Sequence, residues 1–272
     1  MRTIAIPSHI LKHWQLDADD PAVAAQVRQR ITALVNGEPE VSIVIPAYNE
    51  EERILRTLSS LSDSTTLRSV EIIVIDNNSK DATAAIAAAA GVTCVRETTQ
   101  GITPARNRGL REARGKYVLN ADADAIYPPS WIEEMIRPLD APGSKVALTY
   151  GRFSFIPVGN TGRFTYFFYE YLAEFSRWIN KRFREEAVNV YGFNSGFRRL
   201  QGIEADGFTH PPGTNEDGWL AVKLRSKGFG KLHGVKKSSA RVWTTDRRLQ
   251  IDGGLWKALQ KRLKRVASSQ KR

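Results

Sequence analysis

The sequence predicts an α/β fold in which a mostly parallel sheet is flanked by helices. Short β-branched runs alternate with helical patterns over the first half of the chain, as expected for right-handed βαβ crossovers. Polar residues gather directly after several of these runs. The chain has 272 residues, 42% of them hydrophobic and 25% charged, so it can bury a substantial core and is not disordered.

Residues 1–40 are predicted to form a helical appendage that packs on the main domain. Asp20 followed by Pro21 is a favourable helix start, because a capping residue precedes proline at the first helical position. Apolar residues then recur at helical spacing up to Asn36-Gly37, namely Val27, Ile31, Leu34 and Val35.

Five strands are predicted from short apolar runs of the kind that are buried on both faces of a sheet. They lie at 41–45, 71–75, 92–95, 116–120 and 146–150. Two capping boxes are predicted to start helices, one at Asn49 with Glu52 and one at Ser130 with Glu133, and Pro138 is expected to end the second helix. Further helices are expected at 81–90, 103–115, 164–183 and 216–227, and a strand and turn at 191–199.

Ligands of parallel sheets bind beyond the carboxyl ends of the strands, and the sequence places polar residues there. Four stretches meet this description: 46–49, 76–79, 100–107 and 122–124. We therefore expect one binding rim assembled from four separate parts of the chain.

Asp122 and Asp124 are the first candidates for chemistry on this rim. Two carboxylates separated by one small residue would repel each other unless a cation lies between them, and oxygen ligands suit Mg²⁺ or Mn²⁺ bound together with a diphosphate. The alternative is a pair of solvated loop acids or a helix cap before Pro128. His210 and His233 are candidates for a third ligand, although lone histidines are more often packed or exposed.

Three other sites have both a functional and a structural interpretation. Arg106 lies in the first turn of a predicted helix whose free N–H groups favour a phosphate, or it is a surface arginine. Tyr48 and Asp76 suit the stacking and hydrogen bonding of a base, or are a rim residue and a turn former. Glu216 and Asp217 open a late helix, where acids suit the helix dipole, or Asp217 is a general base.

Six stretches resemble, in order, the inverting family 2 glycosyltransferases of GT-A fold. They are VSIVIPAYNEEERI, IDNNSKDAT, GITPARNRG, LNADADAIYPPSWI, GFNSGFRR and TNEDGWLAVKLRSKGFG, and they extend from about Val41 to Gly230. The resemblance implies a GT-A domain over 41–250, with a donor half at about 41–150 and a mixed acceptor-side half at about 151–250. It also implies metal-dependent inverting transfer of a sugar from a nucleotide-diphosphate sugar, with a UDP-sugar favoured, to an acceptor hydroxyl.

The same resemblance implies roles for particular residues. The donor nucleotide is expected at Pro46, Tyr48, Glu50, Asp76, Arg106 and Asp122, and the metal, Mn²⁺ or Mg²⁺, at Asp124 and Asp122. Asp217 is the expected base, and Asn194, Ser195 and Glu216 lie on the acceptor side. Arg247 and Arg248, in a segment similar to one that closes over the diphosphate in some members, are expected diphosphate contacts. Asn77 departs from the family pattern, which has a second acid there.

The net charge of +11 is concentrated at the C-terminus. Seven basic residues and no acid lie between Gly253 and Arg272. A nucleic-acid groove would spread its charge, so we expect no nucleic-acid partner. Residues 251–272 are predicted to form a basic amphipathic helix that either binds an anionic membrane surface or packs on the body. An acceptor that is lipid-linked or a glycan is compatible with the first alternative, and a scaffold without catalysis is the rival function.

Cysteine content and hydropathy indicate the compartment. Cys94 is the one cysteine, so an intramolecular disulfide is impossible and a reducing compartment is expected. No apolar run approaches the roughly 20 residues of a spanning helix, and the first residues lack the pattern of a signal peptide. We expect a cytoplasmic protein, either free or peripheral at the inner face of the membrane.

Overall fold

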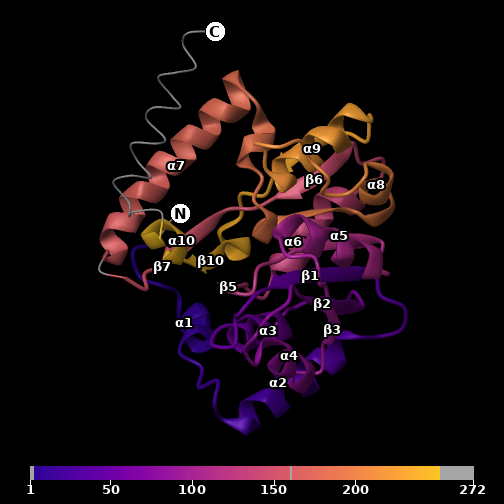
Figure 1. Cartoon of the computed structure of the whole chain (residues 1–272). Helices are drawn as coiled ribbons and strands as arrows, with labels where there is room; N and C mark the ends of the chain where they lie inside the picture. Colours follow the sequence, from indigo (N-terminus) through magenta and orange to yellow (C-terminus); the bar gives the residue numbers. More distant parts are fainter. Residues whose placement is uncertain (1–2, 160, 252–272) are drawn as a thin grey trace.

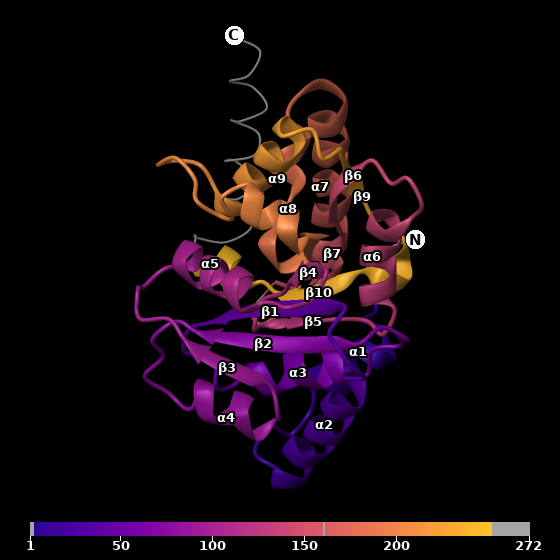
Figure 2. The same cartoon turned by 90° about the vertical axis from the view of Figure 1, so that its right-hand side faces the viewer.

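The computed structural model describes residues 3–159 and 161–251, and its centre is a seven-stranded sheet (Figures 1 and 2). The strand order is β3 (Thr93–Arg96), β2 (Val70–Asp76), β1 (Val41–Ala47), β4 (Tyr117–Asn120), β8 (Ser195–Arg198), β6 (Val146–Tyr150) and β9 (Lys231–Gly234). The four strands from β3 to β4 run parallel, and β9 runs parallel to β6. The predicted α/β fold with a mostly parallel sheet is confirmed.

All five predicted strands are present, but the fifth has an unexpected neighbour. β6 does not pair with β4, because β8 lies between them and runs antiparallel to both. Gly196 of β8 makes this insertion possible, since a Cβ there would lie 2.4 Å from a methyl group of Leu119 in β4. The second half of the chain thus completes the sheet that the first half begins.

A second, three-stranded sheet has the order β5 (Ala125–Ile126), β10 (Val242–Thr245) and β7 (Phe153–Ile156) (Figure 1). β10 is antiparallel to β5 and parallel to β7. None of these three strands was predicted, because β10 pairs with β5 and β7 from distant parts of the chain. Their pairing places the short helix α10 (Arg247–Ile251) next to the loop after β4.

Helices cover both faces of the main sheet (Figure 2). One core cluster joins it to α2 (Pro21–Leu34), α3 (Ile54–Ser62), α4 (Thr83–Ala89) and α6 (Trp131–Asp140). The other joins it to α5 (Ile102–Glu112) and α9 (Glu216–Ser226), and α8 (Arg199–Glu204) contacts both of these helices. Apolar burial on both sides explains why the strands read as continuous hydrophobic runs.

The N-terminal helix forms where it was predicted. Asp20 accepts a hydrogen bond from the Ala22 amide in the first turn of α2, and Val27 and Ile31 are buried in the first core cluster. A shorter helix that the periodicity did not reveal, α1 (Ser8–Trp14), precedes it and buries Ile10.

Both predicted capping boxes are wrong. Asn49 adopts a left-handed backbone with φ of 54° and accepts a hydrogen bond from the Lys80 amide, so α3 begins only at Ile54. Ser130 donates to the carbonyl of Ser239 instead of capping α6. In both places a contact with a distant loop replaces the local cap.

The prediction that Pro138 ends a helix is also wrong, because α6 continues to Asp140.

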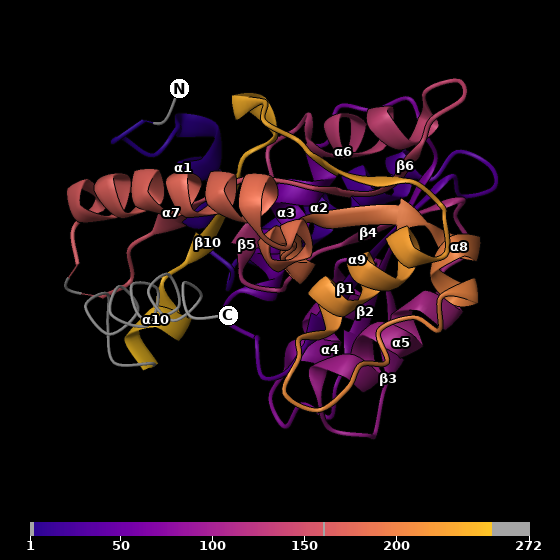
Figure 3. The ribbon, with the colours of Figure 1, turned by 90° about the horizontal axis from the view of Figure 1, so that it is seen from above.

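The aromatic-rich helix is confirmed as α7 (Arg163–Phe183), which lies at the end of the molecule opposite α2 (Figure 1) and is seen along its length in Figure 3. Among the described residues, no helix combines the length and the apolarity needed to span a bilayer.

Candidate active site

A cavity of about 620 Å³ opens at the carboxyl ends of β1 and β4. Six of the predicted site residues line it: Pro46, Tyr48 and Glu50 after β1, Asp122 and Asp124 after β4, and Arg247 after β10. Four aromatic residues form another part of its wall: Phe153, Phe155, Tyr191 and Phe193. Residues from β1 and β4 meet here because the carboxyl ends of adjacent parallel strands share one edge.

Asp122 is joined to Asp217 through Arg106. The Arg106 Nη2 atom donates to Asp122 Oδ1 at 3.0 Å, and Nε lies 3.4 Å from Asp217 Oδ1. Arg106 is 2% exposed and does not line the cavity. Arg106 is thus buried between two carboxylates, and its expected role near the donor diphosphate stays a prediction.

Asp217 lies in the first turn of α9, whose cap is Asn215 accepting from the Gly218 amide. The Asp217 side chain is almost fully buried. This burial raises the pKa of Asp217 to about 7; the Arg106 guanidinium opposes the rise, and the carboxylates of Glu216 and Asp122 add to it. A carboxyl group with this pKa can exchange a proton near neutral pH.

Gly192 covers the buried ion pair. A Cβ at this position would lie 2.3 Å from Arg106 Nη2 and 2.4 Å from both carboxylate oxygens of Asp217, so only glycine fits. Within the described residues, Arg106 Nη1 and Asp217 Oδ1 have no hydrogen-bond partner, although both are buried. These atoms retain hydrogen-bonding capacity for a bound molecule. The sequence did not reveal the role of Gly192, because the residues that it contacts, Arg106 and Asp217, lie far from it in the chain.

Arg247 connects two acidic residues of the cavity wall. Its Nη2 atom donates to Glu50 Oε1 and lies 3.4 Å from Asp124 Oδ2, which also accepts from Thr245 Oγ1 at 3.0 Å. Burial raises the pKa of Glu50; the hydrogen bond from Arg247 opposes this rise and the charge of Asp124 adds to it. The side chain of Arg248 lies outside the described part of the structure.

Asp76 and Asn77, at the end of β2, have structural contacts. Asp76 is buried, accepts from the Ser79 amide and does not line the cavity. Asn77 donates to the carbonyls of Glu97 and Thr99 and accepts from the Gly101 amide. An amide is required for this set, because a carboxylate has no donor. The loop that leads into α5 is therefore fixed by Asn77.

Asn194 and Ser195 lie beneath the cavity and not on its surface. Asn194 is fully buried, accepts from the Trp131 indole N–H and donates to the Arg152 carbonyl. Ser195 is buried and accepts from the Asn120 amide group. Both side chains thus lie beneath the wall of the cavity, and their expected place on the acceptor side stays a prediction. Glu216, next to Asp217, is partly exposed.

The two carboxylates of the D-x-D sequence fit a divalent cation. Asp122 and Asp124 both line the cavity and offer the hard oxygen ligands that Mg²⁺ and Mn²⁺ prefer. The described residues contain no group of three or more His, Cys, Asp or Glu side chains that could hold a metal. A cation at this site would therefore take its other ligands from a bound molecule or from water.

Comparisons with known proteins identify the family of the chain. The model of the family described as glycosyl transferase family 2 matches residues 42–200, more than half of the chain. Succinoglycan biosynthesis protein ExoO of Rhizobium meliloti is 34% identical over 114 residues, 40% of this chain and 32% of that protein. Glycosyltransferase AglE of Haloferax volcanii is 29% identical over 161 residues, 56% and 52% of the two chains. This chain thus matches about a third to a half of the length of these relatives.

Solved structures show the same fold at low sequence identity. The mannosyltransferase PcManGT from Pyrobaculum calidifontis, in complex with GDP-Man and Mn²⁺, has a TM-score of 0.57 and 19% identity, covering 86% of this chain and 68% of that one. TarS of S. aureus with UDP-GlcNAc has a TM-score of 0.59 and 17% identity, covering 76% and 58%. Both the family model and the fold lead to one conclusion: the chain belongs to glycosyltransferase family 2 and has the GT-A fold.

Proposed function

We propose that this protein transfers a sugar from a nucleoside-diphosphate sugar to an acceptor hydroxyl, with inversion at the anomeric carbon. One observation carries the proposal: a large cavity has an exposed tyrosine and two D-x-D carboxylates on its wall, with a buried carboxyl of pKa about 7 behind it. Solved relatives of this fold are complexes with GDP-Man, UDP-GlcNAc and UDP. Uridine is the base we favour, as in the TarS and glucosyl-3-phosphoglycerate synthase complexes.

The nucleoside is assigned to the wall after β1. Tyr48 is 47% exposed and presents a ring on which a base can stack, and Pro46 lies beside it. Asp76 lies behind this wall, where it shapes the turn after β2. Arg247 is assigned to the diphosphate, which would compete with Glu50 and Asp124 for its guanidinium.

The D-x-D carboxylates are assigned to the metal and the ribose. Asp124 and Asp122 would hold Mn²⁺ or Mg²⁺, as suggested by the Mn²⁺ in complexes of two relatives. When bound, the ion neutralises charge on the diphosphate and so favours its departure. Arg106 holds the Asp122 carboxylate in place through the hydrogen bond to Oδ1.

Asp217 is assigned as the general base. Its carboxylate takes the proton of the acceptor hydroxyl while the hydroxyl oxygen bonds to the anomeric carbon, and the bond from that carbon to the diphosphate oxygen breaks. The raised pKa suits this task, since a base is most effective when its pKa is near the working pH. Arg106 stabilises the ionised form of Asp217 before the proton is taken.

Attachment to an anionic membrane remains a prediction of the basic C-terminal segment. Residues 252–272 lie outside the described part of the structure. A chain that ends at Asp252 should sediment less with anionic liposomes than the full chain does. Equal sedimentation of the two chains would refute this role of the segment.

A ligand screen tests the proposed function. We expect nucleoside diphosphates and nucleotide sugars to raise the melting temperature in the presence of Mn²⁺, and the matching nucleosides to have little effect. Without an added acceptor, the best-binding donor should slowly release its nucleoside diphosphate, because its sugar is then transferred to water. The absence of any nucleotide-dependent shift across uridine, guanosine and adenosine diphosphates would overturn the proposal.

A further inference from the structure

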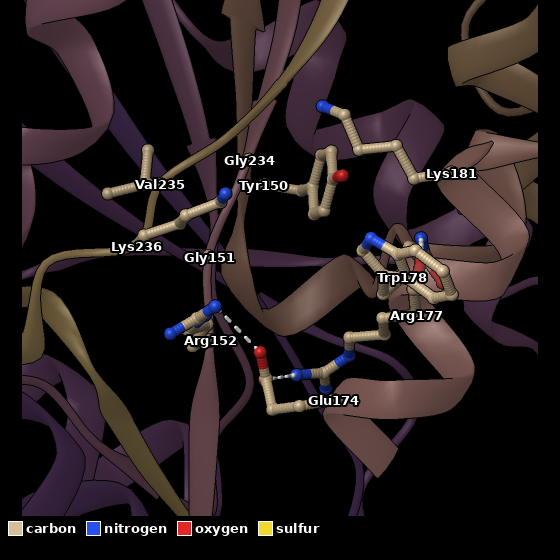
Figure 4. Close-up of a pocket in the computed structure, with 11 residues that line it drawn as sticks. Tyr150, Gly151, Arg152, Glu174, Arg177, Trp178, Lys181, Gly234, Val235 and Lys236 are labelled. Atoms are coloured by element: carbon tan, nitrogen blue, oxygen red, sulfur yellow. Dashed lines mark hydrogen bonds and ion pairs between the residues drawn. The ribbon is translucent and has the colours of Figure 1, made fainter. Parts of the chain in front are cut away.

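A second, smaller hollow of about 120 Å³ lies between α7 and the carboxyl end of β6 (Figure 4). Its wall contains the aromatic side chains Tyr150 and Trp178 and four basic ones. The basic residues are Arg152 after β6, Arg177 and Lys181 on α7, and Lys236 after β9. No residue of this hollow lines the larger cavity.

The hollow has an excess of positive charge. Glu174 is the one acidic residue in its lining and lies 2.8 Å from Arg152 and 2.6 Å from Arg177, as the dashed lines in Figure 4 show. Lys181 contacts Glu186 at 2.8 Å, and Lys236 is exposed. Four cations thus face two carboxylates, Glu174 in the wall and Glu186 next to it, and the remaining positive charge favours an anion.

The lysines near the hollow also affect the pKa of the neighbouring His233. Burial lowers the pKa of His233, and the charges of Lys181, Lys231 and Lys236 lower it further, against a smaller opposing effect of Glu186. The lysines near the hollow thus act on His233 in addition to its burial.

The hollow and the larger cavity share a partition. The guanidinium carbon of Arg177 lies 4.8 Å from the ring centre of Phe153 and 5.5 Å from that of Tyr191, and both rings line the larger cavity. Along the chain, Asn189 lines the hollow, Gly192 covers Asp217, and Phe193 lines the larger cavity. The assigned base is thus covered by the segment that connects the two spaces.

We propose that this hollow binds a phosphoryl group of the acceptor, so that the acceptor hydroxyl is presented to Asp217 from the side opposite the donor. This inference rests on the proposed function. Arginine forks and lysine ammonium groups are the usual partners of phosphate oxygens, and the volume suits a group of a few heavy atoms.

The phosphoryl group can belong to a water-soluble molecule or to a lipid. The two sources are distinguished by whether the ligand also contacts Trp178. Trp178 lines the hollow and is 55% exposed at one end of an apolar strip on α7. The strip also contains the exposed side chains Phe164, Phe168, Tyr171, Leu172 and Phe175. A lipid phosphate would contact this strip with its chain, whereas a soluble phosphate would not.

Calorimetry on the full chain with three probes tests the proposal. Glycerol 3-phosphate represents a soluble phosphate, citronellyl phosphate a lipid phosphate, and citronellol an uncharged lipid. We expect at least one of the two phosphates to bind and citronellol not to bind. Tighter binding of citronellyl phosphate, weakened by Trp178→Ala, would assign the lipid source; equal binding of both phosphates, unaffected by Trp178→Ala, would assign the soluble one.

A matched pair of charge reversals localises the site. Lys236→Glu should weaken phosphate binding about tenfold or more, because it replaces an attraction in the hollow by a repulsion. Lys237→Glu, at the next position, makes the same change outside the lining, where Lys237 contacts Glu134, and should have a much smaller effect. Neither change should alter nucleotide binding in the larger cavity.

Two results would overturn the inference: no binding of either phosphate, or binding that Lys236→Glu and Lys237→Glu weaken equally. Binding of citronellol as tight as that of its phosphate would also contradict it. Failure of the proposed function is seen separately, as a lack of nucleotide binding by the same chain.

Discussion

Arg106 lies between two carboxylates that come from different halves of the chain, with Nη2 3.0 Å from Asp122 Oδ1 and Nε 3.4 Å from Asp217 Oδ1. Asp122 lines the large cavity, whereas Asp217 is buried behind it. Because one guanidinium contacts both, the charge state of the assigned base is linked to the residue assigned to the donor.

Asp217→Asn should leave donor binding nearly intact and reduce sugar transfer by roughly 10²–10⁴-fold, since the amide cannot take the proton of the acceptor. The measurement is release of the nucleoside diphosphate, with donor affinity determined in parallel by calorimetry. Asp206→Asn, an exposed position in the turn after α8, is the matched control and should behave like the wild type. Undiminished transfer by Asp217→Asn would remove the assignment of the base.

The pH dependence of transfer should reflect Asp217. With a folded-state pKa of about 7, the carboxyl is mostly protonated below neutral pH and inactive as a base, so kcat/KM should rise through pH 7 and then level off. An acidic limb centred near pH 4 would show that a carboxyl with an ordinary pKa acts instead.

The free energy of unfolding should also depend on the ionisation of Asp217, but it should fall as the pH rises. The folded state holds this proton more tightly than the unfolded chain does, where the pKa is near 3.8, so the contribution of Asp217 to stability falls as the pH rises from about 4 to about 7. The stability of Asp217→Asn relative to the wild type should therefore increase across this range in urea unfolding experiments. A difference that is independent of pH would contradict the raised pKa.

Arg106→Met should destabilise the protein by about 3–5 kcal/mol, because it leaves the buried Asp217 carboxyl without a compensating charge. Arg108→Met is the control on the same helix. Arg108 is about one-third exposed and pairs with Glu112 four residues later, a contact worth less than about 1 kcal/mol. Chemical denaturation measures both; similar losses in the two variants would rule out a special role for the buried bridge.

Asn77→Asp should cost about 2 kcal/mol or more, since it removes the donors to two carbonyls and leaves these carbonyls facing a carboxylate. The adjacent Asn78→Asp should be nearly neutral, because Asn78 accepts a hydrogen bond from Arg96 and a carboxylate can accept it as well. Thermal melts of the two variants test the difference. Were Asn77→Asp as stable as the wild type, the acid usual in the family would be tolerated here and the loop would not depend on the amide.

The sequence predicts the donor half of the fold well. Short β-branched runs such as Val41–Ala47 are buried on both faces of a parallel sheet, and this burial leaves a direct hydrophobic signal. The strands of the second sheet leave no such signal. β5 has only two residues, and β10 becomes a strand only because β7 and β5, far away in sequence, supply its partners.

Residues of the site could be predicted where the functional side chains are neighbours in the sequence. They could not be predicted where the function depends on packing between distant parts of the chain. Asp122 and Asp124 are recognisable from their spacing, and both line the cavity. The burial of Arg106 and the close approach of Gly192 to Asp217 depend on contacts across 86 and 25 positions of chain, which no local pattern contains. Asn49 and Ser130 failed as caps for the same reason, since distant loops use their side chains.

The central claim is that the D-x-D carboxylates bind a metal-dependent nucleotide donor in the large cavity. Calorimetric titration of uridine diphosphate into the wild type and Asp124→Ala, with and without Mn²⁺, tests it most directly. We predict binding by the wild type that depends on Mn²⁺ and is lost in Asp124→Ala, with an unchanged melting temperature of the free protein as a control for folding. Equal affinity with and without Mn²⁺, or full retention of binding by Asp124→Ala, would contradict the claim.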